Sequence, residues 1–263
     1  MIALHRVGTG EPLVLLHGIG HRWQAWRPVL DRLAEHHDVL AIDLPGFGAS
    51  ALPDGPLAMP DTVARLAAFL ADLGVERPHV AGNSLGGAIG LELAAAGLVA
   101  SATALSPAGF ATARELRWAL GTLRMHRVTA RAPEPLIRRM AYSRRLRALG
   151  WGMIVARPDL LDPEAAVGDA RALRDGRGFP IVARAARGYR FGGNPDVPLT
   201  VAWGSKDRIL LPRQADRARL ALPGARHVTL PGCGHVPMSD APDLVARVIL
   251  QTTGALPEPA PAT

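Results

Sequence analysis

The first candidate for a catalytic group is a serine between two glycines. Ser84 is the centre of Gly82-Asn-Ser-Leu-Gly86, after the apolar run 79–81 and before the helix-like segment 88–96. A serine on a sharp turn from a strand into a helix exposes its hydroxyl at the positive end of the helix dipole. The glycines leave room for a backbone that folds back tightly on itself. The segment predicts a nucleophile, although a chain with 28 glycines among 263 residues also produces this spacing by chance.

A candidate acid and a candidate base follow in the second half of the chain. Asp207 lies in Trp203-Gly-Ser-Lys-Asp-Arg208 after an apolar run, and His235 lies in Gly232-Cys-Gly-His-Val-Pro237. Active groups of parallel sheets gather at the carboxyl ends of the strands. We therefore expect His235 to take the proton of the serine, and Asp207 to orient and stabilise the imidazolium.

These segments together resemble the alpha/beta-hydrolase family. The glycine-flanked serine resembles the nucleophile elbow of that family, and the chain order serine, acid, histidine is that of its triad. By the same resemblance, His17-Gly-Ile-Gly20 is the oxyanion loop. The backbone N–H groups of Ile19 and Leu85 are then the donors to the oxyanion, and His17 braces the loop.

Other residues compete for these roles. Asp207 also suits an ordinary turn, and Asp43 and Asp240 are rival acids. Asp43 precedes the serine, which breaks the chain order, and in the family such an aspartate serves loop structure. We interpret Cys233, the only cysteine, as a small packing residue, with a redox or nucleophilic role as the alternative.

The elements that must position these residues alternate between strands and helices. Buried strands are predicted by apolar runs at 13–16, 38–43, 79–81, 100–105 and 198–204. The alternation with helical segments predicts an α/β fold, a mostly parallel central sheet flanked by helices. By resemblance this is the α/β-hydrolase fold. We assign residues 1–109 and 196–253 to this core.

The alternation stops between residues 110 and 195, where we expect an insertion that resembles the helical cap of alpha/beta hydrolases. The insertion predicts helices at 114–127, 135–148, 163–174 and 179–190. Its large apolar side chains are candidates for an acyl pocket or for the cap's own core: Trp118, Met125, Met140, Tyr142, Trp151 and Met153. Residues 110–190 hold 17 arginines against 7 acidic residues. The Pro- and Ala-rich residues 254–263 predict a disordered tail.

The composition limits which partners and cofactors we expect for this protein. The net charge of +7 comes from a chain in which 29 of 30 basic residues are arginine, a bias typical of GC-rich coding, and no basic stripe alternates with aromatics. We therefore expect no nucleic-acid partner. No cluster has metal-ligand spacing, and Gly46-Phe-Gly48 is too short for a dinucleotide loop, so neither a metal nor another cofactor is predicted.

The compartment is predicted from the cysteine content and from the start of the chain. One cysteine excludes an internal disulfide and permits a reducing compartment. Residues 1–10 lack the pattern of a signal peptide, and the weakly polar region 85–105 carries Glu92. We expect a cytoplasmic protein without stable membrane insertion, and the oligomeric state does not follow from the sequence.

The expected reaction is hydrolysis of a carboxylic ester or related acyl bond in a small molecule, through an acyl-serine intermediate. Gly82-Asn-Ser-Leu-Gly-Gly87 also resembles the elbow of hydrolases that cleave carbon–carbon bonds in aromatic ring-fission products. Val236 stands where those enzymes usually carry an aromatic residue. Further alternatives are a lactonase, a cofactor-free haloperoxidase relative, a membrane-surface lipase and a ligand-binding receptor on a hydrolase scaffold.

Overall fold

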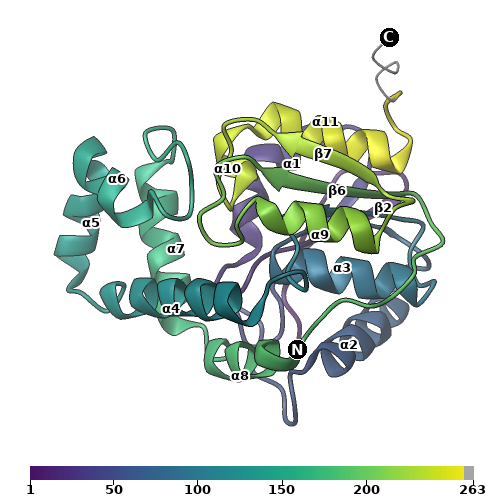
Figure 1. Ribbon diagram of the computed structural model, residues 1–263, viewed down its shortest axis with the longest axis horizontal. Coiled ribbons are helices and arrows are strands. Elements are labelled where there is room, and N and C mark those ends of the chain that lie inside the picture. The colour runs from purple at the N-terminus through teal and green to yellow at the C-terminus, as the bar shows by residue number, and fades with distance from the viewer. Residues whose placement is uncertain (258–263) are drawn as a thin grey trace.

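A computed structural model describes residues 1–257 of the chain and folds them around a seven-stranded sheet (Figure 1). The strands are β1 (Leu4–Val7), β2 (Pro12–Leu16), β3 (Asp38–Ile42), β4 (His79–Asn83), β5 (Ser101–Leu105), β6 (Leu199–Gly204) and β7 (Arg226–Leu230). Their order in the sheet is β1-β3-β2-β4-β5-β6-β7. Only β1, at the edge, runs antiparallel to its neighbour among these strands. The predicted mostly parallel sheet flanked by helices is confirmed.

Strand β2 is apolar at every position because helices cover both faces of the sheet. On β2, Val14 and Leu16 pack into the core on one face, and Leu13 and Leu15 pack into the core on the other. A strand has a side-chain period of two, so such a strand reads as a continuous apolar run and does not alternate with polar residues.

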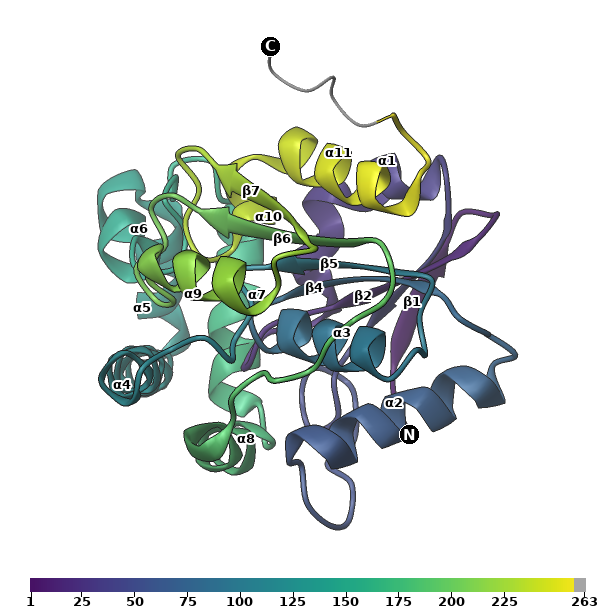
Figure 2. The same cartoon turned by 45° about the vertical axis from the view of Figure 1, so that its right-hand side comes forward.

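Five helices form the two covering layers (Figure 2). One face is covered by α1 (Arg27–Ala34) and α11 (Pro242–Thr253), and the other by α2 (Met59–Asp72), α3 (Leu85–Ala95) and α9 (Arg213–Ala221). Helix α3 starts one residue after Ser84 and is buried along most of its length. Short helices η1 (Trp23–Trp26) and α10 (Pro237–Asp240) precede α1 and α11.

Between β5 and β6 the chain forms helices and no strand in the described part. They are α4 (Ala113–Thr129), α5 (Glu134–Tyr142), α6 (Arg144–Trp151), α7 (Pro163–Asp175), α8 (Phe179–Ala185) and η2 (Ala186–Gly188). Helices α5, α6 and α7 lie at one end of the molecule, beyond the carboxyl ends of the strands (Figure 1). The domain boundaries at 109/110 and 195/196 stay a prediction.

The structure corrects several predicted helices. The expected helix 135–148 is two helices, because Ser143 has extended backbone (φ −89°, ψ 117°) and its side chain caps α6. The expected helix 179–190 ends as an α-helix at Ala185 and continues as the short helix η2 to Gly188. Both differences come from turn and helix-end geometry, which depends on the local backbone more than on apolar spacing.

The predicted disordered tail, 254–263, is described only in part. Leu256 donates a backbone hydrogen bond of 3.1 Å to Leu250, so residues 254–257 fold against α11. Residues 258–263 lie outside the described residues. Within residues 1–257, no helix has both the length and the apolar character needed to cross a lipid bilayer.

Substitution of Gly86 by alanine tests the close approach of α3 to the sheet. A Cβ at Gly86 would lie 2.1 Å from the Leu16 carbonyl oxygen, so Gly86→Ala should lower the free energy of unfolding by about 3 kcal/mol or more. The matched control is Gly121→Ala on the exposed side of α4, where the added Cβ meets no atom within 4 Å. The control should raise the stability by about 0.5–1 kcal/mol in the same urea titration. Equal effects of the two substitutions would contradict the packing described here.

Candidate active site

Four loops leave the carboxyl ends of parallel strands and meet at one edge of the sheet. Residues 17–20 follow β2, Ser84 follows β4, Asp207 follows β6 and His235 follows β7. The loops after β2, β4 and β7 line one cavity, which the helices between β5 and β6 cover. The sheet thus brings together residues that are far apart in the sequence.

The serine is held in a strained backbone conformation. Ser84 has φ 57° and ψ −112°, values that cost a non-glycine residue about 1–3 kcal/mol. The turn is so tight that a Cβ on Gly82 would lie 2.1 Å from the carbonyl oxygen of Gly86. The backbone amide of Ser84 donates to Leu105 on β5 at 2.9 Å, which fixes the turn to the sheet. The hydroxyl consequently sits at the start of α3, on the cavity wall.

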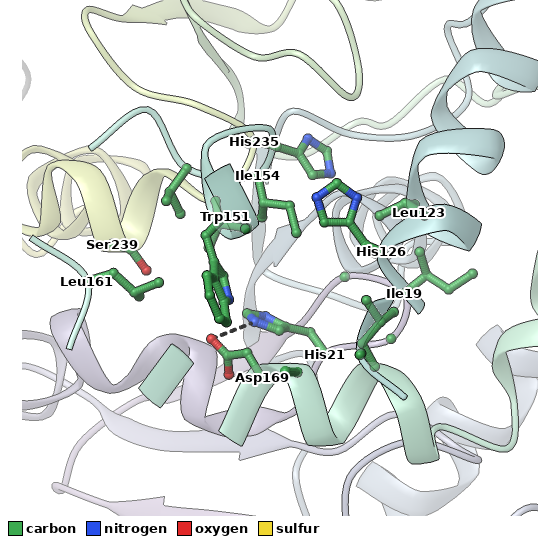
Figure 3. A pocket seen from close by; sticks show the side chains of 18 of the residues that line it. Ile19, His21, Leu123, His126, Trp151, Ile154, Leu161, Asp169, His235 and Ser239 are labelled. Atoms are coloured by element: carbon green, nitrogen blue, oxygen red, sulfur yellow. Dashed lines mark ion pairs between the residues drawn. The ribbon is translucent and has the colours of Figure 1, made fainter. Parts of the chain in front are cut away.

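The two backbone amides predicted as oxyanion donors, those of Leu85 and Ile19, have no acceptor among residues 1–257. Leu85 is the first residue of α3, and the first amides of a helix have no acceptor within it. Ile19 lies in the loop after β2 and lines the cavity (Figure 3). Neither amide donates a hydrogen bond within the described residues 1–257. Such donors stabilise negative charge on a reacting carbonyl oxygen.

The histidine and the aspartate form a buried hydrogen-bonded pair. His235 Nδ1 and Asp207 Oδ2 are 2.7 Å apart. The other carboxylate oxygen accepts hydrogen bonds from the amides of Ile209 (2.8 Å) and Leu210 (2.9 Å). These donors fix the carboxylate, so the imidazole carries its proton on Nδ1 and leaves Nε2 free to accept a proton.

The serine and the histidine line the same cavity, although no hydrogen bond joins their side chains among the described residues. The elbow and the histidine loop are instead bonded through Asn83, whose Nδ2 donates to the His235 carbonyl (2.9 Å) and to the Leu105 carbonyl (3.1 Å). Sequence reasoning gave Asn83 no role, because the residue before the serine looks like a spacer in the motif.

The two rival acids serve the backbone. Asp43 accepts hydrogen bonds from two loop amides, at 2.6 and 2.8 Å. Asp240 accepts from the amides of Gly234 (2.7 Å), Ala156 (3.0 Å) and Arg157 (2.7 Å). Asp240 therefore ties the histidine loop to the segment between α6 and α7. Neither carboxylate is hydrogen-bonded to His235.

His17 and Cys233 are buried and have structural contacts. His17 Nδ1 donates to the Gly18 carbonyl at 2.7 Å, and Nε2 accepts from the Leu44 amide at 2.9 Å, which joins the loop after β2 to the loop after β3. Burial lowers the pKa of His17 to about 3, so its imidazole is neutral at physiological pH. Burial raises the pKa of the Cys233 thiol to about 11, which leaves it unreactive as a nucleophile.

The cavity wall opposite the serine is mostly apolar and comes from the helices between β5 and β6. Its apolar residues include Leu123, Ile137, Met140, Trp151, Val155 and Leu161. Of the six predicted pocket residues, Met140 and Trp151 line the cavity, whereas Trp118, Met125 and Tyr142 are exposed. Met153 does not line the cavity. An apolar wall facing a polar catalytic edge suits a substrate with a hydrocarbon portion.

One polar contact joins the loop after β2 to the helices that cover the cavity. His21 Nε2, just after residues 17–20, lies 3.3 Å from Asp169 Oδ2 on α7 (Figure 3). Arg22 Nε lies 3.7 Å from the other oxygen of the same carboxylate. The loop that carries Ile19 is thus attached to the covering helices. Within residues 1–257, no group of three or more His, Cys, Asp or Glu side chains is placed to hold a metal ion.

Comparison with known proteins gives consistent similarities. A model of the alpha/beta hydrolase family matches residues 13–248. The chain is 30% identical over 258 residues to the pimeloyl-[acyl-carrier protein] methyl ester esterase of Xanthomonas campestris, covering 95% of this chain and 98% of that protein. It is 42% identical over 95 residues to the 2-hydroxy-6-oxo-2,4-heptadienoate hydrolase of Pseudomonas putida, covering 35% of this chain and 34% of that protein. A bacterial membrane phospholipase A structure superimposes with a TM-score of 0.76 at 26% identity, covering 97% of this chain and 82% of that chain.

The buried neutral His17 predicts a specific dependence of stability on pH. Its folded pKa lies below its unfolded value, so its full contribution is present above about pH 6.5 and is lost as the pH falls toward 3. Over that range the free energy of unfolding of wild type should fall by up to about 1.4 kcal/mol per pH unit more than that of His17→Gln. The glutamine amide does not titrate, and it keeps hydrogen-bonding capacity at this position. Urea unfolding at a series of pH values measures both slopes. Parallel slopes would mean that His17 is not buried in its neutral form.

Proposed function

Because the chain belongs to the alpha/beta hydrolase family and is a hydrolase, we propose that it cleaves carboxylic esters or related acyl bonds of small molecules through a covalent acyl-serine. The observation that carries the proposal is the 2.7 Å bond between His235 and Asp207 at the edge of the sheet where Ser84 also lies. The unpaired amides of Ile19 and Leu85 support it, because Leu85 directly follows that serine and Ile19 lines the same cavity.

The proposed reaction has two halves. His235 Nε2 takes the proton of Ser84 Oγ as this oxygen attacks the carbonyl carbon, and the carbonyl π electrons move onto the oxygen. The amides of Ile19 and Leu85 donate to that oxyanion; in enzymes of this type one such donor contributes about 10²–10³-fold to the rate. The tetrahedral species expels the alkoxide, which receives the proton from His235. Water, deprotonated by the same imidazole, then releases the acid and regenerates the serine.

An ester is the preferred substrate because an alkoxide leaves more readily than an amine. The similarity to a methyl ester esterase along nearly the whole chain supports this choice. The apolar cavity wall supports an acyl or alcohol portion of hydrocarbon character. We propose that residues 110–195 act as the cap that selects this portion, since helices α4, α5 and α7 contribute lining residues.

The second candidate function is carbon–carbon bond hydrolysis of a vinylogous diketone. The similarity to the heptadienoate hydrolase favours it, but that similarity covers only 35% of the chain. Val236 lines the cavity next to the proposed base, where such enzymes carry an aromatic residue. The aliphatic side chain at this position keeps the ester as our first choice.

A cytoplasmic location is proposed from the single, unpaired cysteine.

Turnover of p-nitrophenyl acetate and butyrate tests the proposed triad. Ser84→Ala, His235→Ala and Asp207→Asn should each lower kcat by about 10⁴-fold, because each removes a member of one cooperating unit. The matched control is Cys233→Ala, which removes the buried thiol beside the histidine loop and should change kcat by less than about threefold. Retained turnover in Ser84→Ala would refute the acyl-serine. A ring-fission diketone with a kcat/KM above that of the best ester would replace the first candidate function with the second.

A further inference from the structure

The positive charge of the protein is concentrated in three consecutive helices. Residues 113–151, which comprise α4, α5 and α6, hold ten arginines and two glutamates, whereas the remainder of the chain has 20 basic and 21 acidic residues. Both glutamates are already engaged: Glu115 pairs with two arginines of α9, and Glu134 pairs with Arg171 of α7. The net charge of +7 therefore comes entirely from residues 113–151.

Helix α4 shows the pattern most clearly. Residues spaced three and four apart share one side of a helix, and on α4 one such side is exposed along the full length. We call this side the basic-apolar face; it consists of Arg114, Arg117, Trp118, Arg124, Met125 and Val128. The exposed fractions are 50% for Trp118, 64% for Met125 and 59% for Val128. The three arginines have no ion pair or hydrogen bond within the described residues.

The face is not explained by the fold. The opposite side of α4 is buried through Ala119, Leu120 and Leu123, so the exposed apolar side chains do not contribute to that packing. Trp118 donates its indole N–H to the Arg208 carbonyl, 2.9 Å away, while half of the residue stays in water. Exposed apolar side chains among unpaired cations are typical of a surface that binds a partner.

The geometry points to an anionic phospholipid surface as that partner: we propose that the basic-apolar face docks on it. A lipid headgroup layer supplies phosphates for the guanidinium groups and an apolar boundary for the aromatic and aliphatic side chains. Helices α5 and α6, at the same end of the molecule (Figures 1 and 2), extend the pattern with exposed Leu136, Leu149, Arg139 and Arg145. Guanidinium groups alternating with large apolar side chains along one helix match the phosphate layer and the apolar boundary of a lipid surface. Such docking is peripheral and needs no spanning helix.

Docking would place the cavity next to the lipid. The inner side of α4 lines that cavity through Leu123 and His126, while its outer side is the basic-apolar face. One helix thus separates the bilayer from the cavity. This consequence rests on the proposed function: the ester would then be one that partitions into the membrane, with a hydrocarbon chain matched to the apolar cavity wall.

Co-sedimentation with vesicles tests the proposal, with Ser84→Ala protein so that no lipid is consumed. Binding to phosphatidylcholine/phosphatidylglycerol vesicles at low salt should be at least about tenfold stronger than to phosphatidylcholine alone, and should weaken at high salt. Adding Arg117→Gln and Arg124→Gln should weaken binding roughly 25-fold, at about fivefold for each arginine near the surface. Adding Met125→Ser and Val128→Ser should weaken it at least about tenfold, because it removes the apolar contact.

The matched control is the pair Arg184→Gln and Arg187→Gln. Both arginines are exposed and without a partner among residues 1–257, and they lie on α8 and η2. Their substitution changes the net charge equally and should alter vesicle binding less than about threefold. An equal loss in both arginine pairs would assign the effect to net charge and overturn the proposal. Protein that ignores anionic vesicles but binds polyglutamate would also overturn it, in favour of an acidic protein partner.

The docking proposal and the proposed hydrolase activity can be refuted independently. Hydrolysis of soluble p-nitrophenyl butyrate is measured without vesicles in proteins that keep Ser84. Absent hydrolysis together with intact vesicle binding would refute the hydrolase function and leave the docking proposal standing. Hydrolysis that persists without vesicle binding would refute the docking face alone.

Discussion

The tight crossing between β4 and α3 is the constraint on which the rest of the site depends. Gly82 and Gly86 permit backbone contacts that no side chain would fit, and Ser84 between them takes a strained, positive φ. A less tight turn would withdraw the Leu85 amide from the serine and move α3 away from the sheet. The strain is tolerated because α3 is buried almost throughout, so packing holds the turn closed.

The parallel sheet and a few buried polar groups position the remaining residues around that turn. Asn83 joins the elbow to the histidine loop, and Asp240 joins the histidine loop to the segment between α6 and α7, whose Ile154 carbonyl accepts the amides of His235 (2.8 Å) and Val236 (3.2 Å). From α7, Asp169 contacts His21, just after the loop that carries Ile19, a proposed oxyanion donor. The proposed base and the proposed oxyanion loop are therefore both attached to the helices that cover the cavity, which couples the placement of these helices to the geometry of the reaction.

The sequence predicted most of the core and the candidate site residues for a physical reason. A strand buried on both faces is mostly apolar, and polar loop residues meet at its carboxyl end, so Ser84, Asp207 and His235 could be located by what precedes them. Asn83 and Asp240 could not be assigned, because their role is to accept or donate to backbone groups brought near only by folding. The covering helices were the least predictable part. The break at Ser143 depends on capping, which apolar spacing does not reveal. The apolar residues that line the cavity and those on the outer surface have the same spacing, so the sequence could not tell that Met140 lines the cavity and that Met125 is exposed.

The central claim is that this fold makes Ser84 a nucleophile, and covalent labelling tests it most directly. The folded protein is incubated with a fluorophosphonate, and the adduct is located by intact-mass and peptide mass spectrometry. We expect one adduct per chain, on the peptide that contains Ser84, and a labelling rate lowered about 10³-fold or more in His235→Ala, because the base is then absent. Folded wild-type protein that forms no adduct, or forms it on another residue, would show that Ser84 is not the nucleophile.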